Sequence, residues 1–134
     1  MPNWYVVTGA PSSGITTLVN ALRPHTPKIF LEVARTLIDE AREKGISAAK
    51  FRENEGEFQK KVLDAKLKLE AHADTSVLTI FERGVPDSIP YFALAGLDPE
   101  PIKAYARGRY RAVFYVEALA YERITQGQKL MRRA

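Results

Sequence analysis

Two glycines, Gly9 and Gly14, open the segment of this sequence that is best suited to bind a phosphate group. The run 4–8 before them is short, aromatic and β-branched, which predicts a buried strand, and residues 16–22 after them have helical apolar spacing. This is the setting of the G-x-x-x-x-G-K-[ST] motif, in which backbone N–H groups and a helix N-terminus surround a phosphate. The predicted nucleotide-binding residues are Gly9, Ser12, Ser13, Gly14, Ile15, Thr16 and Thr17.

The loop lacks the motif's lysine. Thr16 occupies the position whose hydroxyl binds Mg²⁺, but Ile15 stands where the lysine would reach the β- and γ-phosphates, and its apolar branch is expected where phosphate oxygens would lie. A lysine–phosphate contact is worth roughly 1.5–3 kcal/mol, so nucleotide affinity should fall at least about ten- to a hundredfold, and turnover further. Arg83, Lys28 or the arginines at 107–111 are candidates to replace the lost charge.

A second polar cluster follows the predicted strand 77–81. Glu82 could hold Mg²⁺ through water or polarise a nucleophile, and Arg83 could clamp a phosphate or carboxylate. Asp87 could accept a hydrogen bond from a substrate hydroxyl, which completes a candidate catalytic set. The alternative is a structural turn, with Asp87 capping a helix and Arg83 paired with a neighbouring acid.

A third cluster, Glu32 and Arg35, follows the predicted strand 28–31. The carboxyl ends of parallel strands form the ligand crevice of an open α/β sheet, so this pair could bind a substrate there. The two residues also lie one helical turn apart, and they could form an ordinary i,i+3 ion pair.

Three alternating arginines precede the predicted strand 112–116. A lid that neutralises a phosphoryl group needs such cations, so these arginines are further substrate-binding candidates, although a solvated basic run is the alternative. They are Arg107, Arg109 and Arg111.

Helical patterns alternate with these strands. Apolar residues at helical spacing predict a helix over 33–41, which Gly45 ends, and a longer helix over 48–73. Shorter helices are expected at 87–95, after Pro99, and over 119–133. The strands 4–8, 28–31, 77–81 and 112–116 are almost continuously apolar, as in parallel strands that are covered on both faces. The sequence therefore predicts a three-layer α/β/α domain with a parallel sheet over residues 1–134.

Composition narrows the classes of function. The chain is 46% hydrophobic and 27% charged, without cysteine or an apolar run of membrane-spanning length, which favours a cytoplasmic globular domain and excludes disulfide and thiolate chemistry. The net charge is +4, and the excess of basic residues lies in 103–134. Such a segment could attract nucleic acid, but a solvated face or contacts with a nucleotide's phosphates are the simpler interpretation.

Several segments together resemble a known family. The strand–loop–helix at 4–22, LEVARTLIDEA at 31–41, FERGVPDSIPYFALAGL at 81–97 and RYRAVFYVEALAYE at 109–122 resemble the P-loop family of AAA-type ATPase and nicotinamide-riboside-kinase-like domains. The resemblance implies a kinase-like P-loop fold, ATP or GTP with Mg²⁺, and phosphoryl transfer to a small molecule. It also implies that Glu82 stands where an aspartate is common, and that Glu32 and Arg35 are a substrate-side pair.

The sequence departs from that family at its end as well as at Ile15. The family's final helix and strand appear shortened or absent after the predicted strand 112–116, which would leave a sheet edge for a homodimer or partner chain to cover. Two functions therefore stay open. One is a nucleotide-binding protein of the small-molecule-kinase or ATPase type with weakened catalysis, and the other is an inactive pseudoenzyme that binds a protein or nucleic acid.

Overall fold

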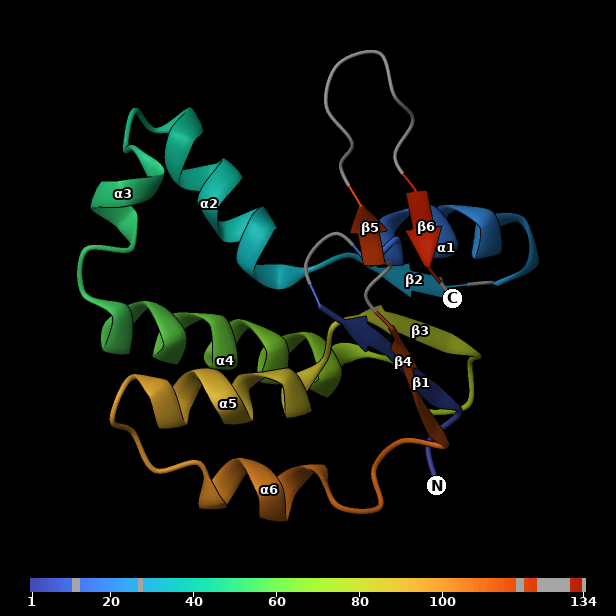
Figure 1. Ribbon diagram of the computed structural model, residues 1–134. Helices are drawn as coiled ribbons and strands as arrows, with labels where there is room; N and C mark the ends of the chain where they lie inside the picture. Colours follow the sequence, from blue (N-terminus) through green and yellow to red (C-terminus); the bar gives the residue numbers. More distant parts are fainter. Residues whose placement is uncertain (11–12, 27, 118–119, 123–130, 134) are drawn as a thin grey trace.

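Four parallel strands form the central sheet, in the order β2-β3-β1-β4 (Figure 1). In this computed structural model, the described residues are 1–10, 13–26, 28–117, 120–122 and 131–133. The predicted parallel α/β sheet is confirmed, and each strand lies within two residues of its predicted bounds. The strands are β1 (Trp4–Gly9), β2 (Lys28–Phe30), β3 (Thr79–Glu82) and β4 (Ala112–Val116).

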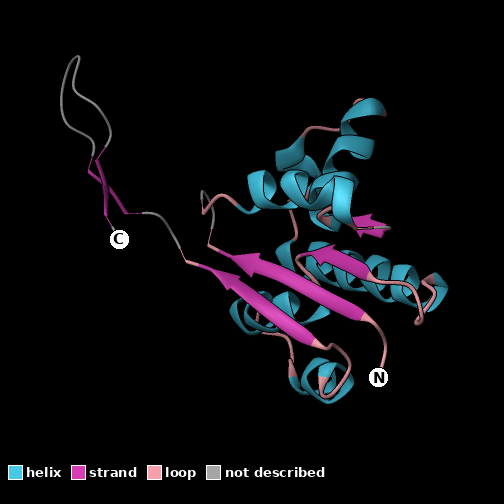
Figure 2. Ribbon diagram, turned by 90° about the vertical axis from the view of Figure 1, so that its right-hand side faces the viewer, coloured by secondary structure: helices cyan, strands magenta, loops and turns pink. Residues whose placement is uncertain are grey.

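Helices cover both faces of this sheet (Figure 2). One face packs against α1, and on the other side α4, α5 and α6 lie next to one another (Figure 1). The predicted three-layer α/β/α fold is therefore present. The helices are α1 (Ile15–Leu22), α2 (Val33–Glu43), α3 (Ala48–Phe51), α4 (Glu55–His72), α5 (Ser88–Leu94) and α6 (Glu100–Ala106), with 3₁₀ turns η1 (Arg23–His25) and η2 (Val85–Asp87).

The central strand β1 contributes to a separate core on each face. Its side chains alternate between the faces, as the pleat of a strand requires. Trp4 and Val6 pack with Phe81 on the side of α4 and α6. Val7 packs on the other side with residues of α1 and with Ile80. Both faces of the sheet are thus buried, which explains the continuous apolar run in the sequence.

The helix predicted over 48–73 is in fact two helices, α3 and α4. Ser47 caps the first by accepting a hydrogen bond from the backbone N–H of Lys50 at 3.2 Å. Asn54 caps the second, because its Oδ1 accepts from the N–H of Glu57 at 3.0 Å. These caps favour a break between the helices, and the apolar stripe alone did not reveal it. Gly45 ends α2 as predicted, with a φ of +82°.

The helix predicted over 119–133 was wrong in the part of that range that the structure describes. Ala120–Glu122 (β5) and Met131–Arg133 (β6) form an antiparallel pair, and the other residues of the range lie outside the described part of the chain. Helical spacing describes one segment at a time, whereas this antiparallel pairing depends on contacts between two segments. No helix within the described ranges combines the length and apolar content that a membrane crossing requires.

Candidate functional site

The glycine loop follows β1 and leads into α1, as predicted. A Cβ atom added to Gly9 would lie 2.3 Å from the carbonyl oxygen of Val116 and 3.0 Å from Ser13 Oγ, so only glycine fits there. Gly14 is the residue before α1 and has a φ of +89°, in the left-handed region that glycine adopts without strain. Ser12 lies outside the described residues. The two glycines thus shape the loop as the motif requires.

Ile15 lies partly where the sequence predicted and partly elsewhere. Ile15 borders the loop pocket, as predicted, but its side chain is buried in the core with Val7, Val19 and Ile80. The expectation that its branch occupies the phosphate position is therefore not supported by the packing. The lysine position is apolar because it contributes to the face of the sheet that α1 covers.

A pocket of about 450 Å³ lies against this loop at the carboxyl ends of the strands. The loop contributes Ser13, Thr16 and Thr17, whose residues line the pocket beside Gly14. The predicted residues Glu32 and Arg35 reach it from the end of β2, and Glu82 and Arg83 reach it from the end of β3. Tyr91 of α5 also lines it, which the sequence did not predict. Residues of three of the four predicted clusters therefore meet in one place, although Asp87 does not line this pocket.

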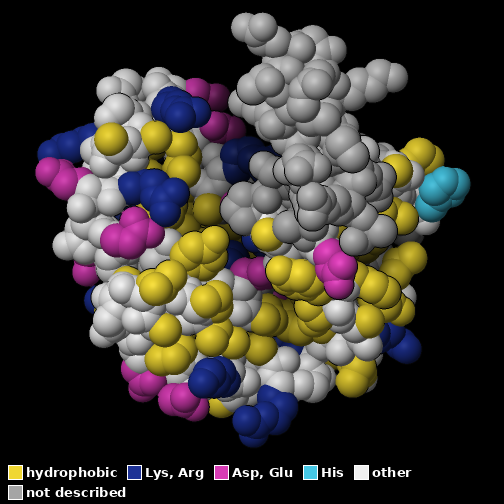
Figure 3. All heavy atoms as spheres, in the orientation of Figure 1, with side chains coloured by type: hydrophobic (Ala, Val, Ile, Leu, Met, Phe, Trp, Pro, Cys, Tyr) yellow, Lys and Arg dark blue, Asp and Glu magenta, His cyan; other side chains and the backbone are white. Residues whose placement is uncertain are grey.

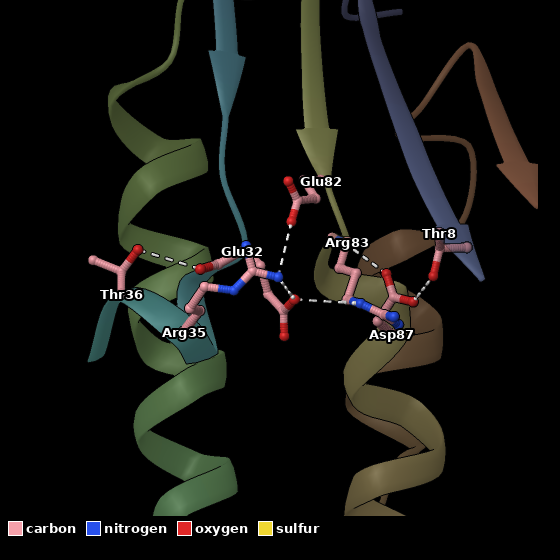
Figure 4. A network of polar contacts seen from close by, with 8 residues as sticks. Thr8, Glu32, Arg35, Thr36, Glu82, Arg83 and Asp87 are labelled. Carbon is pink, nitrogen blue, oxygen red and sulfur yellow. Dashed lines mark hydrogen bonds and ion pairs between the residues drawn. The ribbon is translucent and has the colours of Figure 1, made fainter. Parts of the chain in front are cut away.

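Two arginines and two carboxylates form an ion-pair network across this pocket (Figure 4). Arg35 Nη2 lies 3.3 Å from Glu32 Oε2 and 3.6 Å from Glu82 Oε1. Arg83 Nε lies 3.5 Å from the same Glu32 oxygen. The i,i+3 pair and the Arg83–acid pair, which were the structural alternatives, are thus both present. They also join the ends of two neighbouring strands, so the network fixes guanidinium groups at the pocket.

Two buried side-chain oxygens at this pocket have no hydrogen-bond partner among the described residues: Ser13 Oγ and Glu82 Oε2. The Glu82 side chain is only 1% exposed, and burial raises the pKa of its carboxyl group, while Arg35 opposes that shift. Unpartnered buried polar atoms are uncommon and costly. Within the described ranges no three His, Cys, Asp or Glu side chains gather to hold a metal, but Mg²⁺ needs only one or two carboxylates. Thr16 and Glu82, the predicted Mg²⁺ ligands, line the same pocket.

Asp87 is held from two sides at the edge of this site. Its carboxylate accepts a hydrogen bond from the Thr8 hydroxyl and another from the Gly84 backbone N–H (Figure 4). It stands at the N-terminus of α5 without a side-chain cap bond to that helix. Arg83 beside it has a φ of +57°, which is uncommon for a residue other than glycine. Sequence reasoning missed Thr8, although its place near the end of β1 was a signal.

Lys66 is a functional candidate that sequence reasoning missed altogether. It lies on α4, is only 7% exposed, and its Nζ donates a hydrogen bond to Ser88 Oγ at 3.0 Å. Burial lowers the pKa of Lys66 to about 8, and the attraction of the nearby carboxylates of Asp87 and Glu32 opposes part of this shift. A buried lysine with a lowered pKa beside a pocket is typical of functional sites.

The arginines 107–111 do not line this pocket, and their predicted lid and substrate-binding role stays a prediction. They precede β4 and therefore lie at the amino ends of the strands, opposite the glycine loop (Figure 1). Arg109 is occupied there, with its Nε 3.1 Å from Glu70 and its guanidinium 4.0 Å from the Tyr105 ring centroid. Lys28, at the start of β2, lies at the same distant end and cannot supply the loop's missing charge.

Comparison with known protein families agrees with this geometry. A family model described as AAA domain matches residues 4–130. The chain belongs to the AAA domain family. This AAA domain is a P-loop NTPase-type, nucleotide-binding protein, as the sequence resemblance implied. No curated protein matches the sequence.

Proposed function

We propose that this AAA domain binds ATP or GTP with Mg²⁺ at the glycine loop, and that it is of the small-molecule-kinase or ATPase type with weakened catalysis. The observation that carries the proposal is the pair of buried oxygens, Ser13 Oγ and Glu82 Oε2, that lack partners at one pocket. A bound phosphate with its hydrated Mg²⁺ would supply both missing partners. The Ser13 hydroxyl can donate a hydrogen bond to the phosphate, and the Glu82 carboxylate can accept one from metal-bound water.

The protein's own residues divide the task by position. Backbone N–H groups of the segment 13–17 bind phosphate oxygens at the start of α1. Thr16 and Glu82 hold the cation, which neutralises charge on the phosphates. The residues present therefore fit a nucleotide without any contact from Ile15, whose side chain packs inside the core.

Arg35 and Arg83 supply the positive charge that the missing lysine does not. Both line the pocket and both are paired with Glu32. Arg35 is half-exposed, so its guanidinium can exchange a carboxylate for a phosphate oxygen at little cost in burial. The exchange replaces one charge-assisted contact with another, so it recovers only part of the roughly 1.5–3 kcal/mol that a free lysine would add.

Asp87 is the residue best placed to orient a phosphoryl acceptor. Thr8 and the Gly84 N–H fix its carboxylate, yet a carboxylate has about four lone-pair sites and can accept further hydrogen bonds. An acceptor hydroxyl that donates to Asp87 would face the pocket in which the phosphates bind. Its proton would pass to that carboxylate as the oxygen bonds to the γ-phosphorus, while the bond from that phosphorus to the β–γ bridging oxygen breaks and the nucleoside diphosphate leaves with that oxygen.

Calorimetric titration with ATP and with GTP, each with Mg²⁺, tests this proposal directly. A dissociation constant tighter than about 100 μM supports it, and a flat titration at millimolar nucleotide refutes it. Gly14→Val should abolish binding. Gly45→Val is the matched control, because Gly45 has a similar φ of +82° and an equally open surrounding, but lies far from the loop in the sequence. Both variants carry similar backbone strain, and only the first should lose the nucleotide.

A pair of substitutions at the lysine position separates a disabled enzyme from a rewired one. Ile15→Lys and Ile15→Met both remove the branched side chain from the core, and they differ mainly in the terminal charge. If the lysine variant gains nucleotide affinity and hydrolysis over the methionine variant, the chain is a disabled enzyme. Equal behaviour of the two variants would show that other cations already serve the phosphates.

One observation favours the second function, a docking module. Strand β4 lies at the sheet edge, and Val113, Phe114 and Tyr115 are 50%, 53% and 66% exposed. Hydrophobic side chains gather on this side of the molecule (Figure 3). Proteins usually cover such an edge, so we propose that a second copy of this chain or a partner chain pairs with it. Light scattering tests this, because a clean monomer at high concentration would contradict self-pairing, and Tyr115→Lys should dissociate a dimer.

Binding of a nucleic acid, the other variant of that second function, has less support than binding of a protein. Two basic residues of the segment 103–117 are engaged within the molecule, since Lys103 pairs with Glu100 and Arg109 with Glu70. An attachment driven by phosphate contacts would weaken with added salt, and binding that is insensitive to salt would contradict it.

A further inference from the structure

A second, smaller cavity of about 80 Å³ adjoins the nucleotide pocket, and we call it the side chamber. It shares Glu32, Arg83 and Tyr91 with that pocket. Most of its remaining wall comes from α4, and Asp87 closes it beside α5. A molecule that occupies the side chamber would therefore extend toward the phosphates of a bound nucleotide.

Lys66 lines this chamber, and its buried ammonium group has few partners there. An ammonium group has three N–H donors, and Ser88 is its one hydrogen-bond partner among the described residues. The residue is more than nine-tenths buried, so bulk water does not readily serve the other two donors. A buried charge that lacks hydrogen bonds is unfavourable, and a ligand that accepts from it would relieve that cost.

The carboxylates of the chamber, by contrast, each have two partners within the protein. Glu32 accepts ion pairs from Arg35 and Arg83, and Asp87 accepts from the Thr8 hydroxyl and the backbone N–H that follows Arg83. Lys66 therefore has free donors that lack an acceptor, while Asp87 keeps lone pairs for a further hydrogen bond. A group that only accepts hydrogen bonds, such as a carboxylate, fits Lys66 better than an amine.

Charge and size narrow the ligand further. The wall carries three cations, Arg52, Lys66 and Arg83; Arg52 pairs with Glu55 at 3.0 Å and Arg83 with Glu32, so among the described residues Lys66 is the one of the three without a salt bridge. One cation without a salt bridge suits a monoanion better than a phosphate dianion. The side chamber is also much smaller than the nucleotide pocket, about 80 Å³ against about 450 Å³, so it suits a small molecule better than a large one.

We propose that the side chamber is the acceptor subsite and that Lys66 binds the carboxylate of a small hydroxy acid. This inference rests on the proposed function, because it names the class of molecule that would receive the phosphoryl group. The acid's hydroxyl then lies toward Asp87 and the nucleotide pocket, with which the chamber shares its wall. A hydroxy acid suits both residues, because its carboxylate can accept hydrogen bonds from Lys66 and its hydroxyl can donate one to Asp87.

Glycolate is the probe for this subsite, and ethylene glycol is its neutral counterpart of similar size. Lys66 is followed in ¹³C-lysine-labelled full-length protein by the NMR shift of its Cε, with Lys66→Met assigning the signal. Glycolate should bind in the millimolar range and raise the pKa of Lys66, because an anion stabilises the ammonium. The charged groups that also act on this titration are Asp87, Glu32, Arg83 and Glu70, and they are unchanged between the two ligands.

Two variants on the same helix provide the decisive contrast. Lys66→Met should weaken glycolate binding at least about tenfold, as loss of a charge-assisted hydrogen bond predicts. Lys68→Met should leave binding unchanged, because Lys68 is exposed and pairs with Asp64. Equal responses to glycolate and ethylene glycol, or no response beyond that to sodium chloride, would overturn the inference. Tighter binding of inorganic phosphate than of glycolate would overturn the assignment to a carboxylate.

The same samples distinguish this inference from the proposed function. Calorimetry with Mg²⁺ and ATP is run beside the glycolate titration. Nucleotide binding without glycolate binding removes only the acceptor subsite. Glycolate binding that needs Lys66, in a protein that binds no nucleotide, supports the carboxylate site and removes its assignment to a phosphoryl acceptor.

Discussion

Replacement of Lys66 by methionine should stabilise the protein at neutral pH. Burial lowers the pKa of Lys66 from 10.5 to about 8, a difference of about 2.5 units. At about 1.36 kcal/mol per unit, the folded state loses about 3 kcal/mol by keeping this ammonium charged below pH 8. The variant also leaves Ser88 Oγ without its donor, which costs about 1 kcal/mol. The free energy of unfolding should therefore rise by about 2 kcal/mol at pH 7.

The stability difference between the Lys66→Met variant and the wild type should depend on pH. Between about pH 8 and pH 10.5 the unfolded chain binds more protons at Lys66 than the folded protein does, so the wild type gains stability as pH rises. The methionine variant lacks this gain. Its advantage should therefore shrink across that window and become a deficit of about 1 kcal/mol once Lys66 is neutral in both states. Other groups titrate in both proteins and cancel in the difference.

Urea unfolding followed by tryptophan fluorescence measures this difference at each pH. Trp4 is the chain's single tryptophan and is buried against Phe81, so its emission reports on the core. Lys68→Met on the same helix is the control, and its effect should stay within about 0.5 kcal/mol. The reasoning is refuted if Lys66→Met destabilises the protein at pH 7 by an amount that does not change up to pH 10.5.

Three further outcomes follow from the packing and the charges. Gly9→Ala should lower the urea midpoint and abolish nucleotide binding, because its Cβ would lie 2.3 Å from the Val116 carbonyl oxygen; unchanged binding would contradict the glycine requirement. Glu70→Ala should cost about 3–5 kcal/mol in urea unfolding, since it leaves Arg109 and two tyrosine hydroxyls without their shared partner. Glu82→Gln should flatten the plot of stability against pH above 4.5: the raised pKa of Glu82 makes the folded state bind more protons there, so wild-type stability falls as pH rises.

The parts of the fold that could be predicted are those with local signals. The run Trp4–Gly9 is apolar on both faces, and the glycines after it announce a loop before α1. The strand order β2-β3-β1-β4 depends on contacts between distant segments, and the pairing of β5 with β6 depends on contacts between two segments; the periodicity of one segment encodes neither. Helix caps at Ser47 and Asn54 were readable in principle, because serine and asparagine favour such positions.

The candidate site likewise contains residues that could be predicted from the sequence and residues that were missed. Glu32 and Glu82 could be placed together, because each follows a parallel strand at its carboxyl end. The same rule places Arg109, which precedes β4, at the opposite end, so the sequence already held a signal that Arg109 would not line this pocket. Lys66 also had a signal: it continues the four-residue spacing of Phe58 and Val62 along the buried stripe of α4. A charge on such a stripe indicates a functional or structural partner inside.

The nucleotide pocket holds a buried carboxylate and the side chamber holds a buried ammonium group. Ligand binding at the two cavities should therefore change the number of bound protons in opposite directions. Burial disfavours the carboxylate of Glu82 in one and the ammonium of Lys66 in the other, with Glu32 and Arg83 between them. Binding of Mg²⁺ and nucleotide at Glu82 should therefore release protons near its raised pKa. Binding of a carboxylate at Lys66 should take up protons at about pH 8–9. Calorimetry in buffers of different ionisation enthalpy measures both, and the same sign for the two ligands would contradict the assignment of charges to the two cavities.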